Sequence, residues 1–128
     1  MYEVVAGSLD AVLSRFFQFY DAVVRRVDVD FAGGRPQCEI VIDAQDAEST
    51  SGWSRVVFRM VGVEQFRLEM GKTTFQVLSS GIQIGWHECQ VFLFLDAFPD
   101  DDELPKVSSN RAYFAGDALF WTVGALER

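Results

Sequence analysis

The residues best suited to chemistry lie in one short stretch, "GWHEC", which ends in His87, Glu88 and Cys89. His87 is the only histidine in the chain, and a histidine near a cysteine could act as base and nucleophile or as two metal ligands. Neighbouring strand residues point to opposite faces, so His87 and Cys89 could converge while Glu88 could not join them. We expect an ordinary histidine near a strand end, with no catalytic, metal or cofactor site.

A second candidate is the Asp-Val-Asp unit formed by Asp28 and Asp30, whose carboxylates share one face of an alternating strand. Such a pair could hold a divalent cation against a substrate phosphate. The spacing is common in alternating strands, and no glycine-rich phosphate loop or cluster of cationic residues accompanies it. We therefore expect no metal here and no enzymatic activity.

Carboxylates are concentrated in two parts of the chain. Residues 28–48 and 96–103 together hold eleven of the nineteen acidic residues and one basic residue, Arg35. The second part contains "FPDDDELP", where two prolines disfavour regular structure and leave Asp100, Asp101, Asp102 and Glu103 in a loop. This clustering is typical of an acidic surface that docks another protein.

The overall charge points the same way. A net charge of −8 opposes nucleic-acid backbones and anionic membranes, and it favours encounter with a basic protein. The start of the chain has no secretory pattern and no run of 18 apolar residues occurs, so we expect a cytoplasmic protein. Cys38 and Cys89 are then expected to be small buried thiols rather than a disulfide.

The elements that position these residues follow from the hydrophobic pattern. Ser8 is a plausible N-cap for an amphipathic helix, and the apolar face of that helix would consist of Leu9, Val12, Leu13, Phe16, Phe17 and Tyr20. After the helix the period changes to two, as expected for strands. Residues 44–52 are predicted to form an exposed loop.

The first two strands are predicted to form a hairpin that turns at Gly33 and Gly34. Its buried side would carry Val27, Val29, Phe31, Cys38, Ile40 and Ile42, and its other side Asp28 opposite Glu39, with Asp30 and Asp43 alongside. Like charges across a strand pair are destabilising. Either Arg26, Arg55 and Arg59 neutralise them within the sheet, or the acidic side remains open to a basic partner.

Further strands are expected in residues 53–63, 64–70, 73–78, 81–86 and 88–96. Residues 111–126 are predicted to form a hairpin that turns at residues 115–117, or one long strand bulged at Gly116. The fold class is therefore α+β: one domain, residues 1–128, with an N-terminal amphipathic helix packed on a mainly antiparallel, meander-like β-sheet of about six to eight strands.

The layout "RFFQFYDAVVRRVDVDF", then a hairpin, then "WSRVVFRMVGVEQFRL", "FQVLSSGIQIGW" and an aromatic-rich strand resembles the small immunity proteins of bacterial polymorphic toxin systems. The resemblance covers residues 10–124 and is one of pattern. It implies a cytosolic inhibitor that protects a bacterium by occluding a cognate toxin, with acidic residues facing a basic cleft. No family residue transfers, because these inhibitors vary most at their contact surface.

On this hypothesis the protein is a monomer that inhibits a basic toxin stoichiometrically. The carboxylates would steer and pair with the toxin, and exposed aromatic side chains would anchor the contact; the candidates are Asp28, Asp30, Glu39, Asp43, Asp100, Asp101, Asp102, Glu103, Trp53 and Trp86. Two alternatives remain open: a dimeric secretion-effector chaperone, and a small-ligand-binding domain that uses the aromatic-rich sheet.

Overall fold

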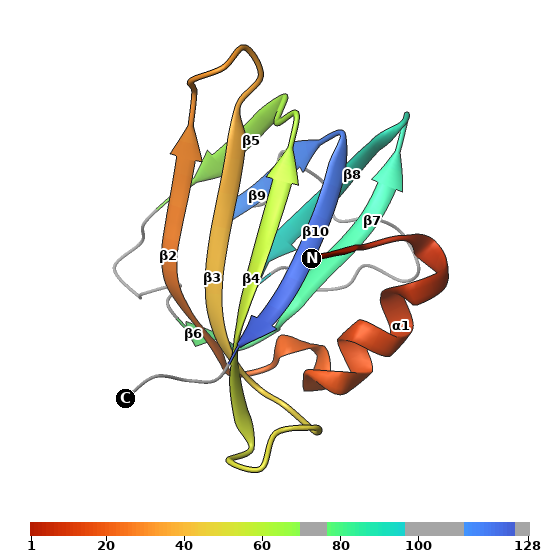
Figure 1. The fold of residues 1–128 in the computed structure, drawn as a ribbon, viewed down its shortest axis with the longest axis vertical. Helices are drawn as coiled ribbons and strands as arrows, with labels where there is room; N and C mark the ends of the chain where they lie inside the picture. Colours follow the sequence, from red (N-terminus) through yellow and green to blue (C-terminus); the bar gives the residue numbers. More distant parts are fainter. Residues whose placement is uncertain (70–76, 97–111, 125–128) are drawn as a thin grey trace.

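A computed structural model describes residues 1–69, 77–96 and 112–124. Its elements, shown in Figure 1, are β1 (Tyr2–Glu3), α1 (Ala6–Arg15), the 3-10 turn η1 (Phe17–Phe19), β2 (Ala22–Asp30), β3 (Gln37–Gln45), β4 (Trp53–Val61), β5 (Gln65–Leu68), β6 (Val77–Leu78), β7 (Ile82–His87), β8 (Gln90–Leu95), β9 (Ala112–Gly116) and β10 (Ala118–Gly124). All strand pairs in these regions are antiparallel. The predicted α+β class is confirmed.

The ten described strands form two sheets, whereas the sequence pattern predicts a single meander-like sheet. Sheet A has the order β1-β10-β4-β3-β2-β6, and sheet B has the order β5-β9-β8-β7. Figure 1 shows the sheets one behind the other with α1 at their side. Strands β4 and β9 make contact across the interior, as do β10 and β8, so the two sheets pack face to face.

The chain crosses between the sheets at Asp117. Residues before it form β9 in sheet B and residues after it form β10 in sheet A, so both predicted forms of this segment, a hairpin and one bulged strand, are wrong. The Asp117 amide donates to the carbonyl of Val61 (3.0 Å). A Cβ on Gly116 would lie 2.9 Å from Met60 Cγ, so the crossing strand passes too close to β4 for a larger residue.

The predicted first hairpin is confirmed. Gly33 and Gly34 have φ of +83° and +97°, which glycine adopts readily. In the register that follows, Val27 lies opposite Ile40 and Asp28 opposite Glu39. The prediction that Phe31 is buried is wrong, because β2 ends at Asp30 and Phe31 is 67% exposed.

The main core lies between the sheets. Along β4, Val56, Phe58 and Met60 are buried and alternate with half-buried outward residues, as predicted. Val91–Leu95 of β8 are all buried, which confirms that this strand is covered on both faces and lies inside its sheet. A second buried group, on the other face of sheet B, consists of Phe92, Phe94, Tyr113 and Ala115.

The helix differs from its prediction at both ends. Its N-cap is Val5, and Ser8 lies inside the helix, where its hydroxyl donates to the Val5 carbonyl (3.2 Å). The helix ends at Arg15, so Phe17 and Tyr20 leave the predicted apolar face and are each 48% exposed. In the described residues, no helix has the length and apolar character needed to span a membrane.

The prediction of an exposed loop at residues 44–52 is wrong for its first three residues. Strand β3 continues to Gln45, and Ala44 is fully buried. Asp46 is only 3% exposed. The surface loop therefore begins after Asp46.

Candidate functional site

The outward face of sheet A carries a set of paired charges, which we call the charge ladder. It consists of Asp28, Glu39 and Asp43 with Arg25, Arg26, Arg55 and Arg59. The register places Glu39 opposite Arg59 and Asp43 opposite Arg55 on β3 and β4. Figure 1 shows no described helix or strand over this face. The sequence left open whether arginines within the sheet neutralise these carboxylates, and the structure shows that they do.

Asp43 is the centre of the charge ladder. Arg25 Nε donates to Asp43 Oδ2 (2.6 Å), and Arg55 donates to both carboxylate oxygens (2.8 and 3.2 Å). A register shift between Val24 and Arg26 brings Arg25 into reach. Burial acts to raise the pKa of Asp43, but the hydrogen bonds from Arg55 and Arg25 outweigh it and hold the pKa below its ordinary value.

The other predicted acids are more accessible. Asp28 is exposed and pairs with Arg26 (3.0 Å), and Glu39 is half-buried and pairs with Arg59 (2.9 Å). Surface pairs of this kind contribute only about 0 to 1 kcal/mol to stability. Asp30 is exposed, and its carboxylate accepts the Ala32 amide of the turn (2.8 Å). Asp100, Asp101, Asp102 and Glu103 lie outside the described residues.

The two predicted aromatic anchors lie in different sheets. Trp53 begins β4 opposite Gln45 and is half-buried. Trp86 is on β7 opposite Val91 and is 40% exposed. The structure therefore does not bring them together into one anchor.

The stretch around His87 forms the tip of the β7–β8 hairpin. Glu88 and Cys89 occupy the turn with φ of +49° and +64°. His87 Nε2 lies 3.6 Å from Glu88 Oε1, and all three side chains are exposed. Cys89 thus differs from its prediction, whereas Cys38 is buried as predicted and burial raises its pKa to about 11. Within the described ranges, no group of three or more potential metal ligands occurs.

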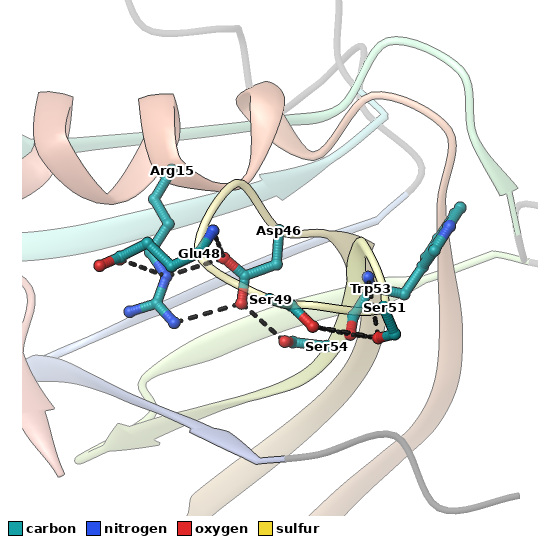
Figure 2. A network of polar contacts seen from close by, with 7 residues as sticks. All are labelled: Arg15, Asp46, Glu48, Ser49, Ser51, Trp53 and Ser54. Atoms are coloured by element: carbon teal, nitrogen blue, oxygen red, sulfur yellow. Dashed lines mark hydrogen bonds and ion pairs between the residues drawn. The ribbon is translucent and has the colours of Figure 1, made fainter.

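A part-buried ion pair that the sequence did not reveal joins the helix to sheet A (Figure 2). Arg15 donates from Nε and Nη2 to the two oxygens of Asp46 (2.9 and 3.2 Å). The Ser54 hydroxyl and the Glu48 amide also donate to this carboxylate (2.6 and 2.9 Å). Burial acts to raise the pKa of Asp46, but the hydrogen bonds from Arg15 and Ser54 lower it to about 2. This network fixes the end of α1 and is structural.

Immediately after α1 lies a feature that the helical pattern conceals, which we call the aromatic turn (residues 16–21). Phe17, Gln18 and Phe19 have φ of +53°, +60° and +59°, and Asp21 has +59°. Consecutive left-handed residues are rare because each costs about 1 to 2 kcal/mol. Buried rings alternate with exposed ones: Phe16 and Phe19 are fully buried, and Phe17 and Tyr20 are exposed.

The aromatic turn is held by the turn between β6 and β7. The Asp21 amide donates to the Leu78 carbonyl (2.9 Å). A Cβ on Gly81 would overlap the carbonyl oxygen of Gln18, so only glycine permits this contact. Asp96 accepts the Ser80 amide through its carboxylate (2.7 Å) and fixes the same turn.

The ion pairs leave an excess of carboxylates. Every arginine that the structure describes is paired: Arg15 with Asp46 and Glu48, Arg25 and Arg55 with Asp43, Arg26 with Asp28, Arg35 with Glu64 and Asp117, Arg59 with Glu39, and Arg67 with Glu69. The described carboxylates with no arginine partner are Glu3, Asp10, Asp21, Asp30, Glu88 and Asp96.

Comparison of the chain with protein-family models, with curated proteins and with solved structures gives no match. The functional interpretation therefore depends on the geometry and charge described above.

Proposed function

We propose that this protein is a non-enzymatic inhibitor of the bacterial immunity type, which acts in the cytoplasm by binding a basic toxin protein stoichiometrically. The observation that carries the proposal is the ion-pair inventory. Because the described arginines are all engaged within the molecule, its described surface offers carboxylates and no free arginine to a partner. The net charge of −8 adds long-range attraction for a cationic protein.

The rigidity of the fold supports inhibition by a preformed surface. The sandwich core is continuous between the sheets, and the charge ladder is held in strand register. A surface that is already ordered loses little conformational entropy on binding, which favours a tight complex. Occluding a basic cleft then requires no chemistry from the inhibitor.

The shifted pKa values in the described residues have structural causes. Burial acts to raise the pKa values of Asp43 and Asp46, but hydrogen bonds from arginines lower them; the pKa of Arg15 is raised by its hydrogen bond to Asp46, and that of Cys38 is raised by burial. None of these groups is arranged as a nucleophile with its base. The proposal therefore assigns the protein a binding role.

Affinity purification from the native host at low salt tests this function. We expect one basic protein to co-purify in a one-to-one complex, measured by native mass spectrometry, and to dissociate as salt is raised. An unrelated tagged protein of similar size and pI is the matched control. Co-expression should also relieve the growth defect caused by the isolated partner.

Other outcomes would contradict the proposal. A stable dimer that carries an extended effector segment would indicate a secretion chaperone. A monomer with no protein partner, whose melting temperature rises with a small molecule, would indicate a ligand-binding domain.

A further inference from the structure

We propose that the aromatic turn is the contact surface of this protein and that it binds an arginine-rich segment of a basic protein. The identity of that protein as a toxin rests on the proposed function, but the binding surface can be tested without it. The evidence is the alternation of buried and exposed rings, a backbone held in an unfavourable conformation, and two carboxylates without cationic partners.

The exposed rings are held in place by the buried ones. Phe16 and Phe19 contact each other with ring centroids 5.2 Å apart, and Phe19 contacts Phe58 of β4 at 5.5 Å. Phe17 and Tyr20 are attached to this anchored backbone, with the Tyr20 amide donating to the Phe17 carbonyl (3.1 Å). Exposed aromatic side chains in fixed positions are typical of residues that dominate protein interfaces.

The strained backbone of the aromatic turn also supports a functional role for it. A helix continued past Arg15 would avoid the left-handed conformations of Phe17, Gln18 and Phe19. The turn instead persists because the β6–β7 turn fits against it, through Gly81 and the Leu78 carbonyl. Strained conformations of this kind concentrate at functional sites, where the surrounding structure over-determines them.

Two carboxylates next to the β6–β7 turn indicate which kind of partner this surface would bind. The Asp21 and Asp96 amides donate to the carbonyls of Leu78 and Gly81, so both acids adjoin the β6–β7 turn. Neither has a cationic partner among the residues that the structure describes. Arginine fits this surface best, because its planar guanidinium can stack on a ring and also donate to a carboxylate.

The charge ladder is less suited to the same partner. Its carboxylates Glu39 and Asp43 already accept hydrogen bonds from arginines of the same sheet. A cationic partner would have to displace those arginines and would meet their positive charge. Residues 16–21 include no arginine, and the adjoining Arg15 is paired with Asp46 and Glu48, so binding to Asp21 or Asp96 requires no such exchange.

Titration of the ¹⁵N-labelled protein with a deca-arginine peptide at low salt, followed by NMR, tests the surface directly. We expect the largest amide shifts at residues 17–21, at Leu78–Gly81 and at Asp96. Shifts centred on Asp28 and Asp30, on Glu88 or on Asp100–Glu103 would overturn the inference, as would an absence of binding. The unaltered protein is used, so the outcome does not depend on a variant that folds.

Substitutions and a second peptide separate stacking from general charge attraction. Phe17→Ala and Tyr20→Ala should each weaken deca-arginine binding about three- to fivefold, with a smaller effect on deca-lysine, which stacks less well. Phe31→Ala removes an even more exposed ring (67%, against 48% for Phe17 and Tyr20) outside this surface, so it is the control variant and should change neither affinity. Equal losses for the two peptides, or for the control, would refute the stacking contact.

The two proposals can fail separately. If a toxin partner co-purifies but Phe17→Ala and Tyr20→Ala bind it as tightly as the wild type, the aromatic turn is not its contact surface. If deca-arginine maps to the aromatic turn but no toxin is found, the surface stands and the immunity function does not.

Discussion

The ion pair between Arg15 and the buried carboxylate of Asp46 gives a specific prediction about stability. Replacing Asp46 with Asn keeps the size of the side chain but removes its charge. The depression of the Asp46 pKa from 3.8 to about 2 corresponds to about 2 to 3 kcal/mol, since each pKa unit represents about 1.4 kcal/mol. Asp46→Asn should therefore lower the free energy of unfolding at pH 7 by about 2 to 3 kcal/mol, which includes some cost of leaving Arg15 partly uncompensated.

The pH dependence fixes the sign of the effect. Because the folded pKa of Asp46 lies below the unfolded value, its contribution is fully present above about pH 4 and is lost as the pH falls through about 2. Urea unfolding of wild type and Asp46→Asn between pH 7 and pH 2 should give a difference that shrinks on acidification. Asp43 also loses its stabilising contribution at low pH, but this loss is the same in both proteins and cancels in the difference.

A matched control uses the second carboxylate on the same arginine. Glu48 Oε2 lies 2.8 Å from Arg15 Nε, but its side chain is 67% exposed. Glu48→Gln should lower the free energy of unfolding by no more than about 0.5 kcal/mol, as for other exposed pairs. If Asp46→Asn were as mild as Glu48→Gln, or if its effect did not change with pH, the reasoning from burial and hydrogen bonding would be refuted.

Three further predictions follow from other parts of the molecule. Gln18→Gly should raise the free energy of unfolding by about 0.5 to 1 kcal/mol in a urea titration, because glycine relieves the left-handed strain, whereas Gln18→Ala should leave it unchanged; a loss with glycine would contradict the strain. Arg59→Glu should destabilise the sheet by about 1 kcal/mol, and the swap Glu39→Arg with Arg59→Glu should recover part of it; no recovery would argue against a direct pair. A thiol reagent at pH 8 should label exposed Cys89 at once, and Cys38 only on unfolding, since its pKa is raised to about 11; early labelling of both would contradict the buried position of Cys38.

The first hairpin could be predicted because its signals are local. Alternating residues on both sides of Gly33 and Gly34 determine which face is buried, and the turn position then determines the register. The opposed pair Asp28 and Glu39 followed from that register alone. The same reasoning identified β8, because an unbroken apolar run indicates a strand covered on both faces.

The division into two sheets could not be predicted, because the decisive pairing is distant in the chain. Strand β10 pairs with β4, and Trp121 lies opposite Phe58. No local pattern distinguishes this from a hairpin between Ala112–Gly116 and Ala118–Gly124. Gly116 lies too close to β4 for a larger residue to fit there, but a single glycine in the sequence does not show which strand it will contact.

The candidate site was hidden for a related reason. Phe17 and Tyr20 continue the spacing of the helical apolar face, and no glycine or proline interrupts it. Tertiary packing of Phe16 and Phe19 overrides that local preference. Asp46 was likewise concealed within a polar stretch, because its partner Arg15 lies in a different element.

The position of β10 has a consequence for how the protein is made. Residues 118–124 form the strand between β1 and β4, so sheet A lacks an interior strand until this segment, which follows all its other strands in the chain, has been synthesised. At about 5 to 20 residues per second, the ribosome would hold an incomplete sandwich for several seconds. Until Trp121 emerges, the Phe16 ring that contacts it, at 5.7 Å between centroids, lacks that partner. Closure of sheet A therefore waits until residues 118–124 have been synthesised, and a nascent chain arrested before β10 would expose its core to chaperones or proteases.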